Sequence, residues 1–192
     1  MSRADPLETL QDSLRGAPII WKGDYPYFIH PISDGIPRME AKVLRATRDL
    51  IIDMVDWSEI DIVVSVEAMG LPLLAAVGEA TGKPTVVIRK RPYGMEGEVR
   101  VDVSTGYSTS TAYINDIKPG DRVLVVDDVI STGGTLEPLL EALEEIGAIL
   151  KGVVIAIEKG KGRERLAEER PNWPIQTLAR IDIVEGRVEI VE

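Results

Sequence analysis

Residues 123–135 read Val-Leu-Val-Val-Asp-Asp-Val-Ile-Ser-Thr-Gly-Gly-Thr, and this stretch carries the strongest structural signal in the sequence. Its first four residues are apolar and β-favouring without alternation, which is typical of a strand buried on both faces of a parallel sheet. Asp127 and Asp128 are predicted to end this strand and to face solvent. Small residues follow, and then leucines at helical spacing between positions 136 and 143. The stretch therefore predicts a strand, a loop and a helix.

The loop has the composition of an anion-binding site. It consists of Ser131, Thr132, Gly133, Gly134 and Thr135. Backbone N–H groups of such a loop and of the following helical turn form a concave pocket that suits a phosphate, and the hydroxyls add donors. Asp127 and Asp128 would repel that phosphate, so we expect them to bind sugar hydroxyls or a hydrated Mg²⁺. A ribose phosphate would provide both ligands, with its phosphate in the loop and its sugar hydroxyls at the two acids.

Three other interpretations share the signal of an apolar run followed by acids. They are the magnesium-binding strand of a P-loop ATPase, the acidic cluster of a phospho-acceptor domain, and an ordinary strand-to-helix turn. A P-loop would require Gly-x-x-x-x-Gly-Lys-Ser/Thr, and the sequence contains neither this motif nor a Gly-x-Gly-x-x-Gly dinucleotide motif.

The composition narrows the class of protein. A chain of 192 residues with 44% hydrophobic content can bury one sizeable core, so we expect one domain with a small appendage. The formal net charge of −10 argues against nonspecific binding to nucleic acid or to an anionic membrane. The absence of cysteine excludes disulfides and thiolate metal sites. With no apolar run near 18 residues and no signal-like N-terminus, the sequence predicts a cytoplasmic protein.

Helices and strands are predicted to alternate along most of the chain. Helical spacing predicts helices over residues 7–14, 38–55, 73–80 and 136–146, and β-favouring runs predict strands over residues 61–66, 85–88, 150–157, 175–183 and 188–191. A basic loop is expected over residues 159–165. This order predicts an α/β fold with a parallel, doubly wound sheet whose ligands lie beyond the carboxyl ends of its strands.

Two segments stand outside this pattern. Aromatic residues gather in residues 21–37, which predicts either a loop packed over the core or a hood that receives a planar base. The single histidine, His30, is predicted to be a hydrogen-bonded structural residue and not a catalyst. Residues 91–110 contain three glycines and scattered valines, which indicates a mobile β-flap instead of core. We therefore divide the chain into an N-terminal helix and hood (residues 1–37) and a core with its flap (residues 38–192).

Residues 123–135 resemble the phosphoribosyl diphosphate (PRPP) signature of the type I phosphoribosyltransferases. Roughly residues 24–165 resemble the purine branch, most closely the archaeal hypoxanthine/guanine enzymes, which are themselves similar to adenine phosphoribosyltransferases. The resemblance implies that Asp127 and Asp128 contact the ribose hydroxyls and that residues 131–135 hold the 5′-phosphate. Residues Glu67, Ala68, Met69 and Gly70 match the loop that holds the diphosphate, which in this family often has a non-proline cis peptide. Arg89 and Lys90 match basic residues that bind diphosphate or purine.

The resemblance also implies an activity. The expected reaction is Mg²⁺-dependent transfer of 5-phosphoribosyl from PRPP to hypoxanthine or guanine, giving IMP or GMP and diphosphate in purine salvage, with adenine and AMP as the alternative. Asp128, Asp127 and Lys90 would be catalytic, and Phe28, Ile29 and Tyr107 would contact the base. The Mg²⁺ would be held by PRPP and water with no direct protein ligand, and the protein would be a homodimer.

Two acids known in the family are missing from the sequence. Adenine phosphoribosyltransferases carry Glu-Tyr-Gly where this chain has Gly106, Tyr107 and Ser108, and other hypoxanthine/guanine enzymes carry an Asp at the position of Ser131. Either Asp128 accepts the purine proton, directly or through water, or the reaction proceeds without a strong base. A PRPP-sensing regulator that lacks catalysis is the alternative from another class, although the sequence shows no helix-turn-helix or basic DNA-reading helix.

Overall fold

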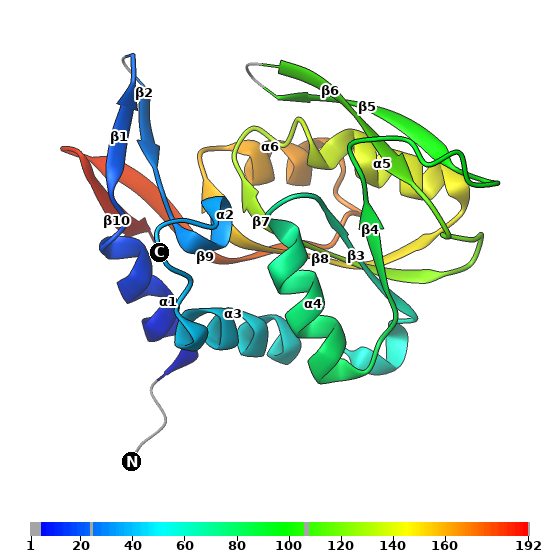
Figure 1. Cartoon of the computed structure of the whole chain (residues 1–192), viewed down its shortest axis with the longest axis horizontal. Helices are drawn as coiled ribbons and strands as arrows, with labels where there is room; N and C mark the ends of the chain where they lie inside the picture. The colour runs from blue at the N-terminus through cyan, green and yellow to red at the C-terminus, as the bar shows by residue number, and fades with distance from the viewer. Residues whose placement is uncertain (1–4, 24, 106–107, 192) are drawn as a thin grey trace.

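The computed structural model describes residues 5–23, 25–105 and 108–191. Its centre is a six-stranded sheet in the order β10-β9-β8-β7-β3-β4, shown nearly edge-on in Figure 1. Neighbouring strands are parallel except for β10, which is antiparallel to β9. The predicted α/β fold with a mostly parallel sheet is confirmed.

The strands of the central sheet are β3 (Ile62–Val66), β4 (Thr85–Ile88), β7 (Arg122–Ile130), β8 (Ile149–Lys159), β9 (Ile175–Val184) and β10 (Arg187–Val191). Two antiparallel hairpins lie outside it, β1 (Ile19–Lys22) with β2 (Tyr25–Phe28), and β5 (Val99–Thr105) with β6 (Ser108–Ile114). The helices are α1 (Pro6–Arg15), α2 (Pro31–Asp34), α3 (Ala41–Asp53), the 3₁₀ turn η1 (Trp57–Glu59), α4 (Gly70–Thr81), α5 (Leu136–Ile146) and α6 (Gly162–Glu169). None of the helices in the described ranges has the length and apolar character that a membrane span requires.

Helices cover both faces of the sheet. In Figure 1, α1, α3 and α4 lie on one face, and α5 with the β5–β6 hairpin lies on the other. Strand β7 shows why its apolar run does not alternate, because Val123 and Val125 join the core on the α5 face while Leu124 and Val126 join the core on the α4 face. The prediction of a strand buried on both faces is confirmed.

The predicted flap is a hairpin whose base belongs to the core. Side chains spaced by two residues along the hairpin are at most 7% exposed, namely Val101, Val103, Ala112 and Ile114. They pack in the hydrophobic cluster that α5 also supplies. The expectation of a flap instead of core is therefore wrong for this part, because alternate apolar residues give the hairpin an apolar inner face. Its mobility stays a prediction.

The hood contains more regular structure than the sequence indicated. The β1–β2 hairpin stands up from the body of the molecule in Figure 1, and the single helical turn α2 follows it. His30 is 1% exposed, and its Nδ1 accepts a hydrogen bond from the N–H of Ile32 at the start of α2. Its Nε2 lies 3.1 Å from Ser13 Oγ in α1. The predicted structural role of His30 is confirmed. The expected basic loop at residues 159–165 is a loop only at Gly160 and Lys161, because β8 ends at Lys159 and α6 begins at Gly162.

Candidate functional site

The two acids lie where β7 loses one of its neighbours. Strand β7 pairs with β3 only as far as Val125, whereas its pairing with β8 continues to Ile130. Asp127 and Asp128 are therefore inside the strand, and the prediction that they end it is wrong. No residue of β7 after Val125 pairs with β3, and the last residue of β3, Val66, pairs with Ile88 of β4, so the second half of β7 faces the loop that follows β3. The acids line this opening at the carboxyl end of the sheet.

A glycine allows the loop after β3 to approach Asp127. A Cβ atom added at Gly70 would lie 1.9 Å from Ser65 Oγ and 2.7 Å from Asp127 Oδ1. No larger residue fits there without displacing both side chains. The peptide bond between Glu67 and Ala68 is cis, as the resemblance implied for this loop. The first turn of α4 consequently sits directly against the acid pair.

Burial governs the electrostatics of the acids. Asp127 and Asp128 are half-buried, so the expectation that they face solvent is wrong. Burial raises the pKa of Asp127, and burial together with the neighbouring charge of Asp127 raises the pKa of Asp128 well above its ordinary value. The carboxylate of Asp34 on α2 raises the pKa of Asp128 further, whereas the ammonium of Lys90 acts in the opposite direction on the pKa of Asp127. A ligand that supplies hydroxyl donors or positive charge would offset this cost of ionisation.

The predicted anion loop is supported from behind by α6. Ser131 and Thr132 are exposed, and Thr135 begins α5 without a side-chain cap. The N–H of Gly162 donates to the carbonyl of Ser131 at 2.8 Å, and a Cβ at Gly162 would lie 2.4 Å from that oxygen. Gly133 has a φ of +82°, which suits glycine. The supporting role of Gly162 was not predicted from the sequence, although the two glycines at residues 160 and 162 are a signal for a close backbone approach.

The cations of the basic loop do not all point into the site. Arg165 pairs with Glu137 at 2.8 Å, and its guanidinium also donates to the carbonyl of Thr132. Arg163 pairs with the buried carboxylate of Glu158 at 2.6 Å. Both arginines therefore stabilise the frame of the loop. Lys159 instead reaches the hood, where its ammonium donates to the carbonyl of Pro26 at 3.0 Å.

The predicted base-binding residues have different surroundings. Phe28 is 5% exposed and packs in the core on the α4 face, with the Lys159 ammonium 5.8 Å from its ring centroid. The N–H of Ile29 is donated to the carbonyl of Pro18 at 2.9 Å, so Ile29 can offer a ligand its carbonyl and side chain. Tyr107 lies outside the described residues. The base-binding assignment stays a prediction.

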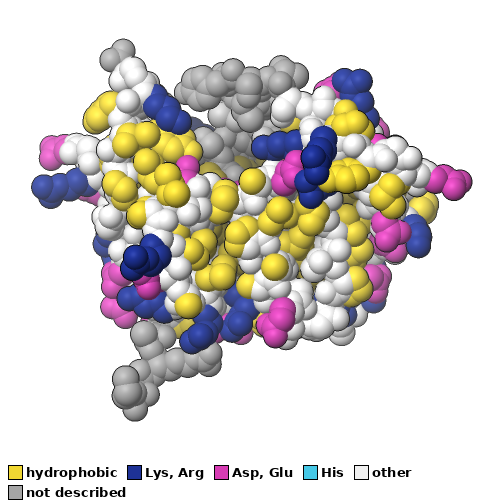
Figure 2. Space-filling model, viewed as in Figure 1, with side chains coloured by type: hydrophobic (Ala, Val, Ile, Leu, Met, Phe, Trp, Pro, Cys, Tyr) yellow, Lys and Arg dark blue, Asp and Glu magenta, His cyan; other side chains and the backbone are white. Residues whose placement is uncertain are grey.

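The basic cluster after β4 lies beside the loop after β3. Glu67 Oε2 is 2.7 Å from Arg89 Nε, and Arg91 Nε donates to the hydroxyl of Tyr93 at 3.1 Å. Figure 2 shows basic side chains with an acidic one between them near the top of this face, over the end of β4. Lys90 is exposed, and its charge acts on Asp127. The structure therefore brings Glu67, Gly70, Lys90 and the acid pair together around one opening.

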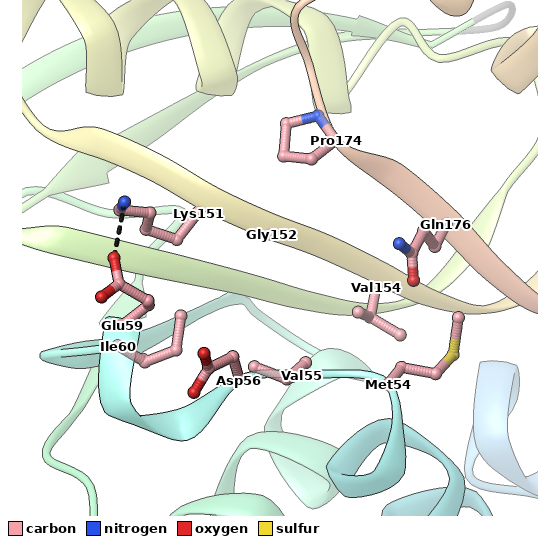
Figure 3. Close-up of a pocket in the computed structure, with 10 residues that line it drawn as sticks. All are labelled: Met54, Val55, Asp56, Glu59, Ile60, Lys151, Gly152, Val154, Pro174 and Gln176. Carbon is pink, nitrogen blue, oxygen red and sulfur yellow. Dashed lines mark hydrogen bonds and ion pairs between the residues drawn. The ribbon is translucent and has the colours of Figure 1, made fainter.

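A separate cavity of about 180 Å³ lies at the other, amino end of the sheet. Figure 3 shows it between the end of α3, η1 and the first residues of β8 and β9. Its charged groups are already paired, because Lys151 donates to Glu59 at 2.8 Å and Asp56 accepts from Ser58. This cavity lacks the half-buried acids with raised pKa values and the glycine-backed loops of the carboxyl end, so we place the candidate site at the carboxyl end.

Comparisons with known proteins identify the family of this chain. Residues 34–177 match the phosphoribosyl transferase domain, and the chain belongs to this family. It is 49% identical to a hypoxanthine/guanine phosphoribosyltransferase of Methanocaldococcus infernus, over 94% of this chain and 98% of that protein. It is 43% identical to the enzyme of the same name from Aciduliprofundum boonei, over 97% and 100% of the two chains. Among solved structures, adenine phosphoribosyltransferase from Rhodothermus marinus is similar, with a TM-score of 0.74 and 28% identity over 93% of this chain and 99% of that one.

Proposed function

We propose that this protein transfers the 5-phosphoribosyl group of PRPP to hypoxanthine or guanine in purine salvage, giving IMP or GMP and diphosphate. The observation that carries the proposal is the pair Asp127 and Asp128, half-buried at the open side of β7 between two glycine-backed loops. The names of the relatives at 43–49% identity support the choice of substrates.

Each part of the site has a role in this proposal. Asp127 and Asp128 bind the ribose hydroxyls, whose donors compensate the burial of the two carboxylates. Residues 131–135 bind the 5′-phosphate through backbone N–H groups and hydroxyls. Residues 67–70, Arg89 and Lys90 bind the diphosphate. Because the carbon under attack becomes positively charged as diphosphate departs, cations around the diphosphate stabilise the transition state more than the ground state.

The acid pair also fits the Mg²⁺ that phosphoribosyltransferases use with PRPP. Among the described residues no group of three or more acids, histidines or cysteines gathers as a protein metal cage. Mg²⁺ keeps most of its waters and binds one or two carboxylates plus substrate oxygens, which suits two carboxylates with raised pKa values. When bound, the ion supplies positive charge to the diphosphate. Asp127 and Asp128 would hold it through PRPP and water.

Asp128 is the proton acceptor in this proposal. The chain lacks the acids that related enzymes use, since Ser131 and residues 106–108 provide none. The raised pKa of Asp128 brings its basicity closer to that of a purine nitrogen at neutral pH, which favours general base catalysis.

The 6-oxopurine preference follows from donors at the hood. A 6-oxo group needs a cationic or N–H donor, and adenine presents a donor at the same position. Of the groups near the hood, the single N–H of Ile29 is bonded to the carbonyl of Pro18, whereas the Lys159 ammonium carries three donor hydrogens and a positive charge, donates to the carbonyl of Pro26 and lies 5.8 Å from the Phe28 ring centroid. We propose Lys159 as the group that recognises the 6-oxo oxygen.

Initial rates with hypoxanthine, guanine and adenine at equal PRPP and Mg²⁺ test the proposal. We expect kcat/KM to be at least about tenfold higher for both oxopurines than for adenine, because a mismatched base leaves buried groups unpaired. Adenine proving tenfold better than both would overturn the base preference alone. PRPP binding without any turnover would identify a PRPP-sensing regulator instead.

The assembly and location belong to the same proposal. We propose a cytoplasmic homodimer, because closed twofold dimers are the commonest soluble assembly and the exposed apolar residues Trp21, Ile36 and Met95 are available for burial. Light scattering at micromolar concentration should give twice the chain mass of 21.1 kDa.

A further inference from the structure

Glu67 poses an electrostatic problem for the proposed function. A carboxylate in a loop that binds diphosphate would repel its ligand. The structure turns this side chain toward the basic segment after β4, where Oε2 lies 2.7 Å from Arg89 Nε and Oε1 accepts a hydrogen bond from the backbone N–H of Lys90 at 2.5 Å. The side chain is only 18% exposed. Its charge is therefore neutralised within the loop.

These contacts prolong the pairing of β3 and β4 beyond the ends of both strands. The last paired residues are Val66 and Ile88, and the N–H of Glu67 donates to the carbonyl of Ile88 at 3.0 Å. The Glu67 carboxylate then forms an ion pair with Arg89 and accepts a hydrogen bond from the N–H of Lys90, the next two residues of the partner segment. The backbone at Arg89 and Lys90 is thus fixed relative to the loop that Gly70 packs against Asp127.

The other side of Arg89 contacts the β5–β6 hairpin. Its N–H donates to the carbonyl of Tyr113 at 3.0 Å, and its carbonyl accepts from the N–H of Tyr113 at 2.7 Å. Arg89 is therefore held between β6 and Glu67, with its guanidinium fixed by the carboxylate. Lys90 follows immediately and projects from a backbone whose direction these bonds determine.

We propose that Glu67 is a positioning residue, whose carboxylate holds Arg89 and the backbone of Lys90 so that their charges face the departing diphosphate. The inference rests on the proposed function and changes the role of Glu67 from a ligand contact to a support. The acid pair and the loop at residues 131–135 do not depend on this support. Removing it should therefore weaken diphosphate binding while GMP, which lacks the diphosphate, binds as before.

Titration calorimetry with magnesium diphosphate and with GMP tests this inference on two variants. Glu67→Ala removes both contacts and should weaken diphosphate binding by about tenfold, the scale on which supporting partners act at other binding sites. Glu67→Gln keeps an acceptor for the Lys90 N–H but loses the charge that holds Arg89, so its loss should be smaller, about threefold. GMP affinity should change by less than about twofold in both variants, because the phosphate loop is untouched.

Glu98→Ala is the matched control. Glu98 accepts hydrogen bonds from the backbone N–H groups of Tyr93 and Gly94, a similar clamp in the neighbouring segment. Within the described residues its carboxylate forms no ion pair with Arg89 or Lys90, and the clamp reaches Arg89 only through the Tyr93 ring, 5.5 Å from the guanidinium. This control variant should leave the affinity for diphosphate unchanged. Equal losses for GMP and diphosphate in Glu67→Ala, or wild-type diphosphate affinity in Glu67→Gln, would overturn the inference. Failure of the wild-type protein to bind diphosphate or form IMP would instead overturn the proposed function.

Discussion

The two ends of strand β7 carry charge in opposite ways. At the amino end, Arg122 pairs with Asp61 at 2.7 Å, and the neighbouring Glu59 is bonded to Lys151 at 2.8 Å. This arrangement lowers the pKa of Asp61 to about 2, chiefly through hydrogen bonds from Arg122. Toward the carboxyl end, burial raises the pKa values of Asp127 and Asp128. The charged groups at the amino end are paired with one another within the protein, whereas the two acids toward the carboxyl end are placed to bind a ligand.

This difference shows why a well-formed cavity need not be the functional site. The cavity in Figure 3 lies beside the paired charges of the amino end. A ligand there would have to compete with existing ion pairs. At the carboxyl end a ligand that supplies donors or positive charge lowers the free-energy cost of ionising Asp127 and Asp128. Such a pair of acids with raised pKa values is the electrostatic signature expected of a functional site. Four predictions test the contrast between the two ends.

The double variant Asp127→Asn with Asp128→Asn should have the largest effect. Losing two charged acceptors, each worth about 2 kcal/mol, should weaken PRPP binding by about a thousandfold. The thermal midpoint at pH 7 should not fall, because the raised folded-state pKa values mean that ionisation of these groups opposes folding at neutral pH. Calorimetry and thermal unfolding measure both quantities. Unchanged PRPP affinity would show that the acid pair is not the ribose site.

Lys90→Ala should have the second largest effect. We expect kcat to fall by about a hundredfold, the scale for removing one transition-state contact. The affinity for the purine monophosphate should fall much less, since the lost charge acts where diphosphate departs. Steady-state rates and nucleotide titration give the two values. Equal losses in both would place Lys90 in the nucleotide site.

The buried side chain of His30 should make the stability of the fold depend on pH. Burial lowers its pKa from 6.5 to about 4, so the unfolded chain binds a proton that the folded protein excludes between these values. Protonation of His30 therefore does not affect the free energy of unfolding above pH 6.5. As the pH drops toward 4 this protonation lowers the free energy of unfolding, by about 2 kcal/mol at pH 5. His30→Asn keeps a side-chain acceptor for the Ile32 N–H but cannot titrate. Denaturant unfolding at pH 8 and pH 5 should show a smaller loss in this variant than in the wild type, and an equal loss would contradict the prediction.

Arg122→Met should have the smallest effect on catalysis. It breaks the amino-end network while preserving a long side chain, so the thermal midpoint should fall slightly and kcat/KM should change by less than about twofold, because exposed ion pairs contribute little. The depressed pKa of Asp61 stabilises the fold above pH 3.8, and this contribution disappears as the pH falls through about 2. The thermal midpoints of the wild type and of Arg122→Met should therefore converge at acid pH. A large kinetic loss at pH 7 would mean that the two ends of β7 are coupled.

The sequence alone determined the buried strand, the loop after it and the helix at residues 136–146, because these features follow from residue types that are neighbours in the chain. Unalternated valines predict a strand covered on both faces, and glycines with hydroxyls predict an anion loop. The same local patterns misplaced the end of β7 and the inner face of the β5–β6 hairpin. Both depend on which strand or helix packs alongside, and local periodicity carries no information about that neighbour.

Only the tertiary structure decided how the side chains of the site are used. It placed Gly70 against Asp127, Gly162 against Ser131, and Glu67 against Arg89. It also buried the acid pair that the sequence placed at a solvent-facing strand end. The partners in each of these contacts come from separate elements of the chain. Their distances, and the pKa shifts that burial causes, exist only once the sheet and its helices have packed together.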